Sequence, residues 1–112
     1  MEEFYKGKDI IVRFDCFEDG KDVTPAGGYV EIYDPDRKYI KADNVEIIDS
    51  EVRYVLEGEL VEKAGIYSFV FNISIRGLGD YPHVTQVEVK DLPIAKEEQW
   101  KSQKSQQILK KT

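Results

Sequence analysis

The sequence predicts an all-β fold, an antiparallel β-sandwich of the immunoglobulin-like or jelly-roll-like type with about seven strands. Three observations predict it. Apolar and polar residues alternate with a period of two, the alternating blocks are short and separated by turn residues, and helical periodicity is absent before residue 94. Alternation of this kind is the pattern of strands that bury one face.

The length and composition favour one folded domain. The chain has 112 residues, of which 41% are hydrophobic and 12% aromatic. This is enough for one ordinary core and too little for two. We expect the β-sandwich to occupy residues 1–93, and a polar, mildly basic tail, helical or disordered, to occupy residues 94–112.

The first half of the chain contains three expected strands. Residues 10–17 place four apolar side chains on one face: Ile10, Val12, Phe14 and Cys16. A turn follows at residues 18–21, and a second strand spans residues 29–33. A short third strand begins at Tyr39.

The second half contains the most apolar expected strand. Residues 45–48 and 52–56 predict a hairpin whose turn contains Asp49 and Ser50. Residues 66–75 then place five apolar side chains on one face: Tyr67, Phe69, Phe71, Ile73 and Ile75. Residues 77–82 predict a loop, and the last strand contains Val84, Val87 and Val89.

The charge distribution excludes one class of partner. The net charge is −6, and residues 1–95 carry 11 basic against 20 acidic residues, a net −9, whereas residues 96–112 carry +3. An acidic body repels nucleic acid, whose binding depends on lysine and arginine. The N-terminus lacks the pattern of a secretory signal, and no apolar run has membrane-spanning length, so we expect synthesis in a cytoplasm without membrane insertion.

Residues that commonly carry chemistry are scarce. Cys16 is the only cysteine, which excludes an intramolecular disulfide, and the alternation points it inward as a reduced core residue. His83 is the only histidine and is expected in a loop beside Pro82. A catalytic triad or a multi-histidine metal site therefore has too few members. We expect no catalytic, cofactor-binding or metal-binding residues and no enzymatic activity.

Three further patterns have ordinary structural interpretations. The segment 34–36 (DPD) offers carboxylates to calcium, but it lacks the twelve-residue calcium loop and is typical of a turn. Gly77-x-Gly79 has Pro82 where a dinucleotide motif needs glycine, and predicts a hairpin or loop. Four tyrosines could stack against sugars, although the core or the sheet surface is the favoured location: Tyr29, Tyr33, Tyr39 and Tyr81.

Three stretches carry a resemblance to a known family: residues 5–10 (YKGKDI), 28–32 (GYVEI) and 62–69 (EKAGIYSF). Together they resemble the β-sandwich modules of tailed-phage baseplate and receptor-binding proteins, and the chain is similar to small tail-region proteins of Bacillus-infecting siphophages. The resemblance covers roughly residues 5–90. It implies a structural or adsorption role in the tail region of a virion, together with other phage tail proteins, and no active site.

Two functional hypotheses follow. The first is a non-enzymatic structural or interaction protein of a tailed-phage particle, in the tail tip or adsorption apparatus. The second is a carbohydrate-binding β-sandwich module that recognises a cell-surface polymer. The apolar residues of the tail are the expected interface residues: Trp100, Ile108 and Leu109. They predict a homo-oligomer, and the resemblance suggests a trimer.

Overall fold

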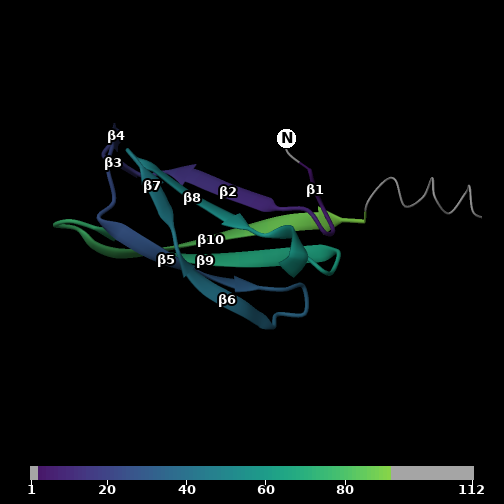
Figure 1. Ribbon diagram of the computed structural model, residues 1–112. Coiled ribbons are helices and arrows are strands. Elements are labelled where there is room, and N and C mark those ends of the chain that lie inside the picture. The colour runs from purple at the N-terminus through teal and green to yellow at the C-terminus, as the bar shows by residue number, and fades with distance from the viewer. Residues whose placement is uncertain (1–2, 92–112) are drawn as a thin grey trace, which may run out of the picture.

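The computed structural model describes residues 3–91, and this part of the chain is almost entirely β-structure (Figure 1). Its elements are β1 (Phe4–Tyr5), β2 (Ile10–Asp15), β3 (Phe17–Glu18), β4 (Lys21–Asp22), β5 (Gly27–Tyr33), β6 (Tyr39–Asn44), β7 (Glu46–Ile48), β8 (Glu51–Leu56), the 3₁₀ turn η1 (Gly58–Leu60), β9 (Gly65–Ile75) and β10 (Gly79–Lys90). Seven of these strands are longer than two residues, which agrees with the predicted number.

The strands form two main sheets. The larger has the order β1-β10-β9-β5-β6, the smaller has the order β2-β8-β7, and β3 and β4 form a separate short hairpin. Every pairing is antiparallel except that of β1 with β10. The predicted all-β fold is therefore confirmed, whereas the expected C-terminal tail lies outside the described residues.

The short hairpins follow from local turn chemistry. In β7–β8, Ile48 pairs with Glu51, so Asp49 and Ser50 form the connection that the sequence predicted. In β3–β4, the two connecting residues Asp19 and Gly20 have φ values of 53° and 77°. Two positive φ values are characteristic of the type I′ turn, whose twist matches that of paired strands.

The predicted loop at residues 77–82 is wrong over its second half. The turn is short, and β10 begins at Gly79 and pairs with β9 from there to Val89. Pro82 is tolerated within β10 because, in the part of the chain that the structure describes, the other neighbour of this strand is β1, which pairs only with Val89 and Lys90. Residues 79–88 thus form an edge, where a missing N–H need not break a ladder.

The core lies between the inner faces of the two sheets. Its buried side chains are Ile10, Val12, Val30, Ile32, Val52, Tyr54, Leu56, Val61, Tyr67, Phe69, Phe71, Ile73 and Val89. Phe69 and Phe71 stack with ring centroids 6.4 Å apart. The predicted inward face of residues 66–75 is confirmed, with Ile75 only half-buried at its end.

Tyr67 shows how the core accepts a polar atom. Its ring is buried, and its hydroxyl donates to the Lys63 carbonyl oxygen at 2.9 Å and accepts from the Lys63 amide at 3.1 Å. Both hydrogen-bonding capacities of the hydroxyl are therefore used inside the protein, as a buried phenol requires.

Candidate functional site

An apolar pocket opens at one end of the sandwich, between the start of the β3–β4 hairpin and the β9–β10 hairpin. Figure 1 shows these two hairpins at the same end of the molecule. The pocket has a volume of about 250 Å³. Six side chains that form it are Phe14, Cys16, Phe17, Ile75, Tyr81 and His83. We call it the apolar pocket.

The pocket forms because the inward-facing side chains of β2 become more exposed toward the C-terminal end of the strand. Its inward residues change from 0% exposed at Ile10 to 5% at Val12 and to half-buried at Phe14. Phe14 still packs edge-on against Phe71, with centroids 5.0 Å apart. Beyond Phe14 the inner face of the β9–β10 hairpin is only partly covered, so its aromatic and aliphatic side chains reach solvent.

Cys16 is half-buried rather than a core residue, which corrects the prediction. It lies after the end of β2, where the strict alternation that pointed it inward has stopped. It packs against the edge of the core and lines the apolar pocket. Burial, and then the neighbouring Asp15 carboxylate, raise the pKa of the Cys16 thiol, which disfavours the reactive thiolate.

His83 lies in β10, so its predicted location in a loop is wrong. The inner face of β10 carries it opposite Phe71. Its ring packs on Phe14, with centroids 4.1 Å apart and an angle of 32° between the planes. The histidine therefore lines the apolar pocket, and one face of its ring is packed against Phe14.

A second hollow, the polar groove, lies on the outer face of the larger sheet. Its volume is about 480 Å³, and it spans β5, β6, β9 and β10. The residues that give it its chemistry are Gly27, Tyr29, Asn44, Asn72, Ser74 and Asp80. Strand pairing explains the grouping, since Tyr29 pairs with both Asn44 and Asn72, and Ser74 pairs with both Gly27 and Asp80.

The four tyrosines considered for sugar stacking do not form one platform. Tyr29 lines the polar groove, and Tyr81 lines the apolar pocket. Tyr33 and Tyr39 form an edge-to-face pair with centroids 5.9 Å apart. Three of the four thus belong to the region of β5 and β6, and of these three Tyr29 lines the polar groove.

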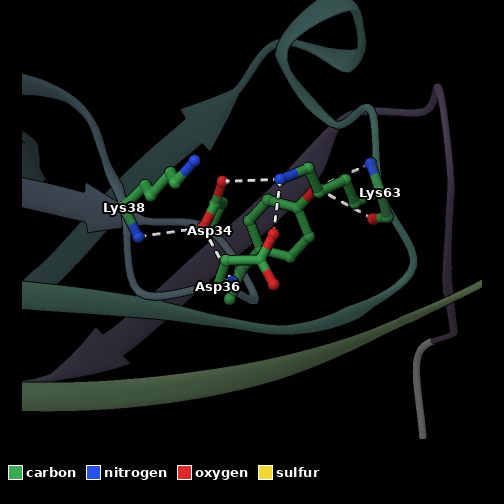
Figure 2. A network of polar contacts seen from close by, with 5 residues as sticks. Asp34, Asp36, Lys38 and Lys63 are labelled. Carbon is green, nitrogen blue, oxygen red and sulfur yellow. Dashed lines mark hydrogen bonds and ion pairs between the residues drawn. The ribbon is translucent and has the colours of Figure 1, made fainter.

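The carboxylates of the acidic turn at residues 34–36 are paired with amide and ammonium groups of the protein itself (Figure 2). One oxygen of Asp34 accepts from the amides of Asp36 at 2.8 Å and of Lys38 at 2.9 Å. The Lys63 ammonium bridges Asp36 at 2.6 Å and Asp34 at 3.3 Å. The Lys38 amide, more than any other group, lowers the pKa of Asp34. Through these contacts the turn holds β5, β6 and the segment before β9 together.

The structure places the remaining features as follows. Gly77 and Gly79 form the turn into β10, as the hairpin interpretation predicted, with φ values of 82° and 99°. Within residues 3–91 the structure contains no group of three or more potential metal ligands, and no helix there is long and apolar enough to cross a membrane. Trp100, Ile108 and Leu109 lie outside the described residues.

No family model and no curated protein matches the chain. The two hollows are therefore interpreted from their own residues. Sequence reasoning missed the polar groove, because long-range strand pairing brings its residues together. The chain has only two asparagines, Asn44 and Asn72, and both line this groove.

Proposed function

We propose that this protein is a non-enzymatic structural component of a tailed-phage particle, in the tail tip or adsorption apparatus, and that it assembles through the apolar pocket. The observation that supports assembly through this pocket is the apolar surface around it. Phe17 and Tyr81 are 61% and 44% exposed, and Leu78, at the tip of the same hairpin as Tyr81, is 41% exposed. Apolar surface gathered in one place is typical of protein interaction sites. The phage assignment is supported by the resemblance of residues 5–90.

The proposed occupant of the apolar pocket is the C-terminal segment of a second copy of the chain. That segment has the apolar residues that such a pocket would take: Trp100, Ile108 and Leu109. The charges are also complementary. Residues 96–112 carry five lysines and two glutamates, whereas Asp15 and Glu18 line the pocket, and among the described residues no lysine or arginine does so.

The direction of β10 favours a second copy over the same chain. The strand leaves the pocket near His83 and ends at Lys90, at the opposite end of the sheet (Figure 1). That path is roughly 23 Å at 3.3 Å per residue. To reach its own pocket, the segment after Lys90 would have to reverse its direction and run back along the whole path. A neighbouring copy imposes no such requirement, and repeated contacts between copies add avidity.

Replacing Trp100, Ile108 and Leu109 together by alanine in the full-length chain should abolish self-association. The molar mass measured by light scattering should fall to that of one chain over a concentration series. Cys16 should at the same time react faster with a thiol reagent, because the segment no longer covers the pocket. The matched control replaces three polar residues of the same segment, Gln103, Gln106 and Gln107, and should keep both properties unchanged.

Two outcomes of that comparison would overturn the proposed docking. The first is a wild-type chain that stays monomeric at every concentration. The second is an oligomer of unchanged mass and unchanged Cys16 reactivity in the triple-alanine variant, which would place the interface elsewhere.

The particle assignment has its own test. Mass spectrometry of purified particles of the phage that encodes this chain should detect the protein at a fixed ratio to the other tail proteins. Its absence from purified particles, with abundant protein in the infected cell, would exclude a role as a virion component.

A further inference from the structure

We propose that the polar groove binds one unit of a neutral saccharide polymer, with Tyr29 as the stacking residue. This proposal is independent of the docking at the apolar pocket, because the two hollows share none of the residues that the structure describes. It rests on three features of the groove: its shape, its set of polar groups and its charge.

The shape is suited to a ring-sized ligand on a sheet surface. A volume of about 480 Å³ lies within the range of small-molecule sites, about 300–1,000 Å³. The space exists partly because Gly27, two residues before Tyr29 on the outer side of β5, has no side chain. A Cβ placed on Gly27 would meet no atom within 4 Å, so the room beside the Tyr29 ring is open.

The polar groups suit hydroxyl groups. The amides of Asn44 and Asn72 both donate and accept, the Ser74 hydroxyl does the same, and the Asp80 carboxylate accepts. Sugar hydroxyls also donate and accept, so they can satisfy such a set. The Tyr29 ring is 45% exposed, and Asn72 Nδ2 donates to its hydroxyl oxygen at 3.1 Å. This bond orients the ring while leaving its exposed surface available for stacking.

The charge excludes two other ligand classes. Among the described residues, no lysine or arginine lines the groove, so a phosphate or sulfate group would have no cation to pair with. Within residues 3–91, Asp80 is the only carboxylate lining it, which is too few for a metal ion. A neutral ligand rich in hydroxyls fits the set that remains.

The surroundings of the groove favour a polymer over a single sugar. Tyr33 lies four residues after Tyr29 on the same outer side of β5, about 13 Å away at 3.3 Å per residue. It pairs edge-to-face with Tyr39, which is 58% exposed. A chain that leaves the groove along β5 therefore meets a second aromatic surface, and we expect affinity to increase with the length of the oligosaccharide.

The test is an NMR titration of the full-length ¹⁵N-labelled chain with neutral glucose and N-acetylglucosamine oligosaccharides of one to six units. The side-chain NH₂ signals of Asn44 and Asn72 report directly on the groove, since no other asparagine is present. We expect saturable shifts of these signals and tighter binding of the longer oligosaccharides. Glycerol phosphate serves as the anionic probe and should leave the signals unchanged.

Three variants locate the binding. Tyr29→Ala should weaken it about two- to tenfold, the loss expected for an aromatic contact. Gly27→Leu should weaken it by filling the groove while leaving Tyr29 in place. Val84→Ala is the control, because Val84 is 59% exposed on the same sheet and lines neither hollow.

Each contrary result overturns the proposal. No saturable shift with any oligosaccharide would remove the ligand class. Shifts with glycerol phosphate alone would assign an anion instead. Equal affinity in wild type, Tyr29→Ala and Gly27→Leu would place the sugar outside the groove. None of these outcomes bears on the oligomer, whose mass is measured separately.

Discussion

Phe71→Ala should destabilise the protein by about 3–5 kcal/mol, the usual cost of removing a fully buried phenylalanine ring. Phe71 is 0% exposed at the centre of β9. Its ring stacks on Phe69 and receives the edge of Phe14, so its loss leaves a cavity that contacts both sheets. Urea denaturation followed by circular dichroism measures the change in free energy of unfolding. The total free energy of unfolding of a small domain is about 5–15 kcal/mol, so this variant should lose much of its stability.

The matched control for Phe71→Ala is Ile66→Ala. Ile66 lies in the same strand on the opposite face and is 52% exposed. Its truncation should change the free energy of unfolding by about 0.5 kcal/mol or less, as exposed substitutions usually do. A loss below about 1 kcal/mol for Phe71→Ala would show that the two sheets do not meet at this ring.

Gly58→Ala should cost about 1–3 kcal/mol, because the added methyl group has no room. A Cβ on Gly58 would lie 2.4 Å from the Gly7 carbonyl oxygen and 3.0 Å from the Lys8 carbonyl carbon. These are backbone atoms, so no side chain can rotate away. Two hydrogen bonds also fix the loop at residues 7–9 against η1. The Gly58 amide donates to Asp9 Oδ1 at 2.7 Å, and the Gly7 amide donates to the Val61 carbonyl oxygen at 2.8 Å.

The control for Gly58→Ala is Gly27→Ala, where the same methyl group enters open space. Gly27 lies in β5 without a positive φ, so alanine should be neutral or slightly stabilising there. Both variants are compared with wild type in the same urea experiment. If Gly58→Ala matched Gly27→Ala, the loop at residues 7–9 would have to move freely, and the close packing against η1 would be wrong.

The alternation of residues alone was sufficient to predict which side chains of β2 and β9 face inward. A strand turns successive side chains to opposite faces, so a run such as Tyr67, Phe69, Phe71 and Ile73 can be buried on one side only. Turn residues were equally informative at Asp49 and Ser50. The sequence pattern gave wrong predictions at two places, the end of one strand and the edge of a sheet. Cys16 lies past the end of β2, and Pro82 and His83 lie in an edge strand that tolerates proline.

Neither hollow could be predicted from the sequence, because each is formed by strands that are distant along the chain. The order of strands places β5 between β6 and β9, and the register then aligns Tyr29 with Asn44 and Asn72. A shift of one residue would turn these side chains to the other face. The local pattern thus determined the fold class and the faces of the strands. Long-range pairing decided which outward side chains became neighbours, since that choice depends on how the two sheets bury their common core.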